Sequence, residues 1–202
     1  MTPIPKDTII VVSGLPRSGT SLMMQVLEKA GLPLLTDQLR TADLDNQRGY
    51  YEYEPVKFMK AGDLTWLELA KGKVVKIISH LLAYLPSSYP VKVVFMLRDL
   101  SEVVASQDRM LKNRGEVEKT TVGDGELVRI FEKHLQDIKS WIAQQPKIEV
   151  VYMDYNYLMQ DPSTALAPLE GFLGINATTP DVLSVVDPKY YRQRSGGITR
   201  AH

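Results

Sequence analysis

Residues 8–30 join an apolar run, a glycine-containing loop and a helical pattern without interruption. The run TIIVVS (8–13) leads into GLPRSGTS (14–21), and LMMQVLEKA continues to Gly31. A strand that passes through a glycine loop into a helix leaves backbone N–H groups and a partial positive charge at the helix start, where a phosphate can bind. The segment therefore predicts an α/β unit with an anion site, although a glycine turn can also simply start a helix.

The loop departs from the nucleoside-triphosphate pattern G-x-x-x-x-G-K-[ST] in one informative way. Gly14 and Gly19 have the required spacing, but Thr20 stands at the lysine position and the basic residue, Arg17, lies inside the loop. In that pattern the lysine and the next hydroxyl serve polyphosphate and magnesium. A phosphosulfate carries less charge and needs neither of them. Arg17 is placed to stabilise the bridging oxygen, where charge accumulates as the bond to the sulfuryl group breaks.

The rest of the chain alternates apolar runs with helical patterns. Four Val- and Ile-rich runs, 8–13, 73–79, 92–98 and 148–154, lack polar alternation, which is typical of strands buried on both faces of a parallel sheet. Helices are predicted over 18–30, 101–113, 125–144 and 161–172, each with a stop or cap signal. The prediction is one α/β domain, 1–202, of the P-loop type: three α/β/α layers around a mainly parallel sheet.

Composition excludes several classes of function. The formal net charge is +0, so no global charge attracts nucleic acid, and the absence of cysteine removes disulfides, thiolate metal sites and thiol nucleophiles. The chain has no apolar run of about 20 residues to span a membrane. Its first seven residues are too polar and too few for a signal peptide. A cytoplasmic protein without a transmembrane segment is expected.

A second basic element follows the third apolar run. KVVFMLRD places Arg98 at the carboxyl end of a strand, where open α/β sheets bind ligands, and Ser106 lies eight residues further on within the next helix. A strand end and a helix can hold one anion from two sides. The alternative is that Arg98 pairs with Asp99 or another surface carboxylate.

Together these segments resemble the sulfotransferases that use 3′-phosphoadenosine 5′-phosphosulfate (PAPS). PRSGTS (16–21) resembles the 5′-phosphosulfate loop of that family, and RDLSEVVAS (98–106) its 3′-phosphate motif. YMDYNYLMQDPSTALAPLEGFLGI (152–175) resembles the family's C-terminal strand and helix, and NQRGYYE (46–52) is similar to a segment of bacterial members. The resemblance covers most of the chain in order.

The resemblance implies how the donor is held. The 5′-phosphosulfate would bind to Pro16, Arg17, Ser18, Gly19, Thr20 and Ser21, and the 3′-phosphate to Arg98 and Ser106. The late basic segment 190–202 contains Arg192 and Arg194, which have the chemistry of the family's flap over the 3′-phosphate, although a disordered basic tail fits the sequence equally. The implied reaction moves the sulfuryl group to a hydroxyl or amine, needs no metal and releases adenosine 3′,5′-bisphosphate (PAP).

Two side chains compete for the role of general base. SHLLAYLP resembles the family's strand–histidine segment and makes His80 the preferred base, although its lysine neighbour, Lys76, is further away than in the family. If the strand stays regular that far, alternation puts Lys76 and His80 on one face. The alternative is a carboxylate after the first helix, with Asp37 nearest and Asp43 and Asp45 behind it. A structural role for His80 also stays open.

Two competing functions fit parts of the sequence. VVYMD (150–154) resembles the magnesium-binding strand of ATPases, so a nucleotide or small-molecule kinase is one alternative. A non-catalytic PAP- or PAPS-binding module is another, and it would need only the residues that bind the donor. The acceptor, a small molecule or a peptide hydroxyl, is not defined by the sequence. The chain is short for the family, so a second subunit could complete the acceptor pocket. The segments 33–53 and 115–124 have no clear assignment. The aromatic side chains within 33–60 could line an acceptor wall or pack into the core.

Overall fold

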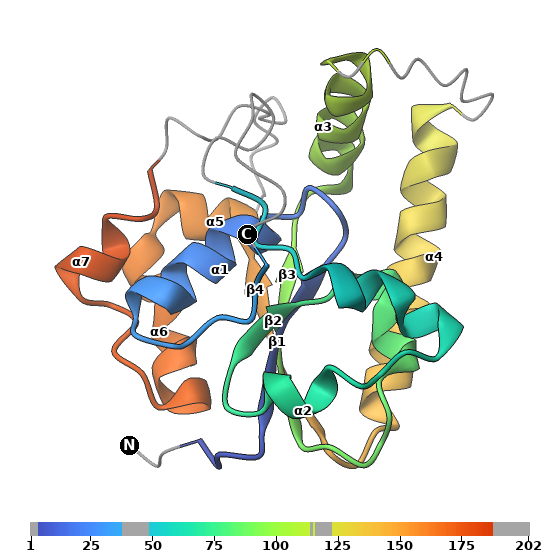
Figure 1. Cartoon of the computed structure of the whole chain (residues 1–202). Coiled ribbons are helices and arrows are strands. Elements are labelled where there is room, and N and C mark those ends of the chain that lie inside the picture. Colours follow the sequence, from blue (N-terminus) through green and yellow to red (C-terminus); the bar gives the residue numbers. More distant parts are fainter. Residues whose placement is uncertain (1–3, 38–48, 114, 116–122, 188–202) are drawn as a thin grey trace.

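A computed structural model describes residues 4–37, 49–113, 115 and 123–187 of the chain. Four strands form one sheet: β1 (Ile9–Gly14), β2 (Val74–Lys76), β3 (Val91–Leu97) and β4 (Ile148–Asp154). All neighbouring pairs are parallel and the order is β2-β1-β3-β4 (Figure 1). The predicted parallel sheet is confirmed. Because all strands run the same way, their carboxyl ends meet at one edge, with β1 and β3 at its centre.

Helices cover both faces of this sheet. They are α1 (Thr20–Lys29), α2 (Leu67–Ala70), α3 (Leu100–Asn113), α4 (Asp124–Ala143), α5 (Tyr155–Gln160), α6 (Pro162–Leu173) and α7 (Pro180–Leu183), with 3-10 helices η1 (Glu54–Ala61) and η2 (Ser79–Tyr84). Side chains alternate along β1, so Ile10 and Val12 pack with α1, α5, α6 and α7, whereas Ile9 and Val11 pack with α2, α4, η1 and η2. The two cores form the predicted α/β/α layers (Figure 1).

The local start and stop signals act as expected. Asp161 caps α6, because its Oδ1 accepts a hydrogen bond of 3.1 Å from the backbone N–H of Thr164, and Pro162 occupies the first turn. Gly174, in the left-handed conformation, ends the helix. The helices predicted at 18–30, 101–113 and 125–144 are present as α1, α3 and α4 within two residues at each end.

Two strand predictions were wrong in detail. The second strand ends at Lys76 rather than at residue 79, and the chain then winds into η2, so strand alternation does not carry from Lys76 to His80. β4 is not buried on both faces: it lies at the sheet edge, and Tyr152 keeps 41% of its surface exposed while it packs edge-on against Phe95. An apolar run alone does not distinguish an edge strand from a central one.

Much of the chain without a clear assignment lies outside the described residues, including 38–48 and 116–122. The short elements η1, α2, α5 and α7 were not predicted, because four to eight residues are too few to establish a helical period. None of the described helices is both long and apolar enough to cross a membrane.

Candidate functional site

The glycine loop between β1 and α1 requires its glycines for two different close approaches. Gly14 has φ 145°, and a Cβ there would lie 2.6 Å from the carbonyl oxygen of Met96 on the neighbouring strand. Gly19 has φ 98°, and a Cβ there would lie 2.3 Å from the ring of Tyr155. Arg17, between them, also has a positive φ of 71°. The loop therefore turns tightly over the sheet edge and packs against α5.

This turn leaves a helix start without an intrinsic cap. Gly19 occupies the N-cap position of α1 and has no side chain to accept from the first-turn N–H groups, and that turn carries no acidic residue. In the described part of the chain, the buried hydroxyl groups of Ser13 and Ser18 have no hydrogen-bond partner. Unsatisfied donors beside a positive helix end are the chemistry of an anion site.

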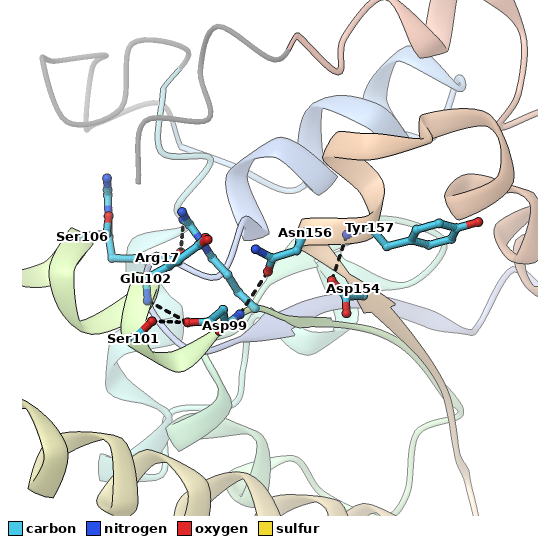
Figure 2. A network of polar contacts seen from close by, with 9 residues as sticks. Arg17, Asp99, Ser101, Glu102, Ser106, Asp154, Asn156 and Tyr157 are labelled. Carbon is cyan, nitrogen blue, oxygen red and sulfur yellow. Dashed lines mark hydrogen bonds and ion pairs between the residues drawn. The ribbon is translucent and has the colours of Figure 1, made fainter. Parts of the chain in front are cut away.

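The two arginine-bearing segments meet directly. Arg17 Nε donates to Ser106 Oγ at 3.0 Å, and Arg98 Nη1 donates to the backbone carbonyl of Arg17 at 3.0 Å. Arg98 Nε also donates to Glu102 at 3.0 Å, and the side chains of this ion pair are only 7% and 2% exposed. Figure 2 shows the loop arginine reaching across to α3. Residues that are separated by 81 and by 89 positions in the sequence therefore belong to one polar network.

Asp99 fixes the start of α3 in this network. Its Oδ1 accepts from Ser101 Oγ and from the backbone N–H of Glu102, and its own N–H donates to Asn156 Oδ1 at 3.1 Å (Figure 2). The Ser101 hydroxyl is the largest cause of a lowered pKa at Asp99. The close carboxylate partner of Arg98 is Glu102, one helical turn along, while Asp99 serves as the helix cap.

Tyr155 supports both halves of the site. Its buried ring lies under Gly19, and the guanidinium carbon of Arg98 lies 4.4 Å from the ring centroid. Burial raises the pKa of this phenol. Sequence reasoning missed Tyr155 and Glu102. The spacing D-x-x-E of Asp99 and Glu102 is a helix-start signal that could have indicated Glu102, whereas no local signal indicates Tyr155.

His80 lies at the same edge of the sheet, in η2. Lys76 pairs with Val12, and the Ile77 N–H donates to the Val12 carbonyl, so η2 begins near the level where β1 gives way to the glycine loop. The His80 ring is stacked on the ring of His134 from α4, with centroids 4.1 Å apart and planes 11° apart. His80 is exposed overall, whereas Ser79 beside it is fully buried.

Asp37, the alternative base, is engaged with the backbone. Its carboxylate accepts a hydrogen bond from the N–H of Glu54, and its own N–H donates to the carbonyl of Glu52. It therefore helps to hold the start of η1. Nearby, Lys76 Nζ and Ser21 Oγ both donate to the carbonyl of Tyr50, which ties this segment to the start of α1. Asp43, Asp45, Arg192 and Arg194 lie outside the described residues.

The histidine pair makes stability depend on pH. Burial, and then the charge of His80, lower the pKa of His134 below its ordinary value of 6.5. As the pH falls below 6.5, the unfolded chain binds this proton before the folded one does, so the free energy of unfolding decreases until the folded pKa is passed. Urea denaturation at about pH 8 and about pH 5.5 should show this loss in the native protein and less of it in His134→Phe. Equal pH dependence in both would contradict the assignment.

Comparison with known proteins identifies the family. The model of the sulfotransferase domain matches residues 6–196. The chain belongs to the sulfotransferase domain family. Members of this family are PAPS-dependent enzymes. The family resemblance implied a strand, a glycine loop, a second arginine motif and a C-terminal helix in this order, and the structure shows these elements in that order. A sequence search among curated proteins finds no match.

Solved structures share the fold at low sequence identity. The sulfotransferase domain from the curacin biosynthetic pathway is 18% identical with a TM-score of 0.53, and the match covers 98% of this sulfotransferase and 82% of that chain. The domain from the Synechococcus PCC 7002 olefin synthase is 15% identical with a TM-score of 0.51, covering 100% and 93%. Mouse SULT7A1, solved in complex with PAP, is 14% identical with a TM-score of 0.55, covering 91% and 65%.

Proposed function

We propose that this sulfotransferase moves a sulfuryl group from PAPS to a hydroxyl or amine acceptor by direct in-line transfer, with a side chain as general base. One observation carries the proposal: the glycine loop and the strand–helix motif are bonded to each other through Arg17, Ser106 and Arg98. A donor with phosphate at both its 5′ and 3′ positions needs two anion sites at a fixed separation. This network brings the two candidate segments together at one sheet edge, which supports the proposal.

The residues of the glycine loop fit the 5′-phosphosulfate. The uncapped start of α1 supplies backbone N–H groups, and the buried hydroxyl of Ser18, which has no hydrogen-bond partner among the described residues, supplies a further donor. The hydroxyls of Thr20 and Ser21 lie at the same helix start, and that of Ser21 also donates to the carbonyl of Tyr50. Arg17 is the cation of the loop and stabilises the PAP oxygen that leaves the sulfuryl group. A dianionic phosphosulfate can be held by these donors, so the missing P-loop lysine is not required.

Arg98 and Ser106 form the proposed 3′-phosphate site. Glu102 holds the Arg98 guanidinium from one side and the ring of Tyr155 supports it from another, so the charge is fixed in place before the donor arrives. Ser106 already bonds to Arg17, and the same hydroxyl therefore couples the two phosphate sites. ATP lacks the 3′-phosphate and would leave this arginine without its ligand.

His80 is the better placed of the two candidate bases. It is exposed at the carboxyl edge of the sheet, whereas the carboxylate of Asp37 is occupied by the N–H of Glu54. An imidazole accepts a proton readily near neutral pH, and a carboxylate needs a raised pKa to do the same. Asp154, the residue that suggested a kinase, caps α5 by accepting from the N–H of Tyr157 at 3.0 Å, so a helix-capping role accounts for it without a metal (Figure 2).

Calorimetric titration without magnesium tests the donor site. PAP is expected to bind at least about 10-fold more tightly than AMP or ATP, because only PAP carries the 3′-phosphate that Arg98 and Ser106 would contact. A preference for ATP that grows with magnesium would contradict the proposal and favour a kinase. Tight PAP binding without transfer to any acceptor in a broad panel would instead indicate a binding module that does not catalyse.

A further inference from the structure

A partly buried hydrogen bond and a ring stack join η2 to α4. Ser79 Oγ and His134 Nε2 share a hydrogen bond of 2.8 Å, and the His134 ring stacks on His80 with centroids 4.1 Å apart. Ser79 and His80 are neighbours in η2, while His134, 55 residues beyond Ser79, lies in the middle of α4. One imidazole is thus fixed by its nitrogen and presents its face to a second, exposed imidazole.

The surroundings favour a neutral ring at His134. Its burial and the neighbouring charge of His80 lower its pKa, and Asp137, one turn along α4, acts in the opposite direction. The carboxylate of Asp137 is also paired with Lys133 at 2.9 Å, on the exposed side of the helix. A neutral ring can stack on His80 in both protonation states of His80, whereas two charged rings in contact would repel each other.

We propose that Ser79 and His134 position the His80 ring for removal of the acceptor proton. This inference rests on the proposed function, in which His80 is the base. In that reaction the acceptor proton moves to a ring nitrogen of His80 while the acceptor oxygen or nitrogen bonds to sulfur and the bond between sulfur and the PAP oxygen breaks. His134 touches none of the reacting atoms and acts only through the ring that it holds.

The need for such a support follows from the location of His80. A 3-10 turn is a short element with poor hydrogen-bond geometry, and an exposed side chain on it samples several rotamers. The stack on α4 and the fully buried Ser79 restrict the orientation of the His80 ring. General-base catalysis depends on that orientation, because a displacement of about 1 Å can cost on the order of 100-fold in rate.

Nuclear magnetic resonance of the histidine rings tests the arrangement independently of activity. The chain has three histidines, His80, His134 and His202, so single substitutions assign the three ring Cε1–H signals. The His80 signal should be shifted upfield by the stacked ring and should move downfield in His134→Ala but stay in His134→Phe, which keeps an aromatic face. Ser79→Ala should leave the stack but broaden the signal. An unchanged His80 signal in His134→Ala would overturn the proposal.

Kinetics separate positioning from catalysis. With PAPS and 2-naphthol as probe acceptor, His134→Ala should lower kcat by roughly 10- to 100-fold with PAP affinity unchanged. In His134→Phe, kcat at about pH 7.5 should stay within a few fold, because phenylalanine keeps an aromatic face against the His80 ring. Gln136→Ala, an exposed neighbour on α4, is the matched control and should match the native enzyme.

The outcomes distinguish this inference from the proposed function. If His80→Ala abolishes transfer while His134→Ala and Ser79→Ala retain the native kcat and pH profile, His80 is the base and the positioning role is wrong. If the His80→Ala variant still catalyses sulfuryl transfer at the native rate, His80 is not the base. The positioning role is then wrong as well, even if the ring signals confirm that His134 stacks on His80. The inference is supported if His134→Ala loses kcat but binds PAP as the native protein does. It also requires that Gln136→Ala keeps the native pH profile.

Discussion

Gly19→Ala is expected to lower the free energy of unfolding by roughly 2–6 kcal/mol, the combined scale of backbone strain and an overpacked contact. The residue has φ 98°, which a side chain disfavours, and the new Cβ would lie 2.3 Å from the buried ring of Tyr155. Neither the loop nor the ring can yield freely, because the Arg98 guanidinium lies against the same ring. Guanidinium denaturation measures the loss, and PAP affinity should fall with it.

Gly31→Ala is the matched control for this prediction. Gly31 has a similar φ of 92°, but a Cβ there would meet nothing within 4 Å among the described residues. It should therefore show the strain alone, about 1–2 kcal/mol, and leave PAP binding intact. The double variant Gly19→Ala/Tyr155→Leu should recover part of the loss. Equal destabilisation by Gly19→Ala and Gly31→Ala would show that contact with Tyr155 is unimportant.

Arg98→Met is expected to affect both stability and donor binding. It removes the partner of the Glu102 carboxylate, whose side chain is 2% exposed, and loss of one member of a buried ion pair costs about 3–5 kcal/mol. It also removes the cation proposed for the 3′-phosphate. The lost charge-assisted contact, roughly 2–4 kcal/mol, corresponds to PAP binding about 30- to 700-fold weaker. Denaturation and calorimetry measure the two effects separately.

The double variant Arg98→Met/Glu102→Leu separates these two effects. Replacing both members of a buried pair by apolar residues is often close to neutral, so stability should largely return while PAP binding stays weak. Lys112→Met provides the comparison on the same helix, because the Lys112–Asp108 pair is exposed and its loss should change neither property noticeably. If PAP affinity returned together with stability, Arg98 would have a structural role only, and the 3′-phosphate assignment would be wrong.

The polar network shows where sequence reasoning stopped. The motif RDLSEVVAS indicated Arg98 and Ser106 through their spacing, but that spacing does not indicate that Arg98 would bond to Glu102 and to the Arg17 carbonyl. The alternative, that Arg98 pairs with Asp99 or another carboxylate, is met in part: the partner is the buried Glu102. Asp99 instead accepts from the N–H of Glu102, because a carboxylate directly before a helix can cap its first turn. Tyr155 could not be predicted, because only the approach of α5 to the glycine loop places its ring there.

The amino-acid sequence by itself determined the parallel α/β fold, the glycine loop and the family. Those features depend on residues close together in the chain: apolar runs, glycine spacing and helix caps act over a few residues. Only the tertiary structure decided that β2 stops at Lys76, that β4 lies at the edge, and that His134 stacks on His80. These depend on which distant segments pack together, and each such contact is selected by the whole core rather than by any local pattern.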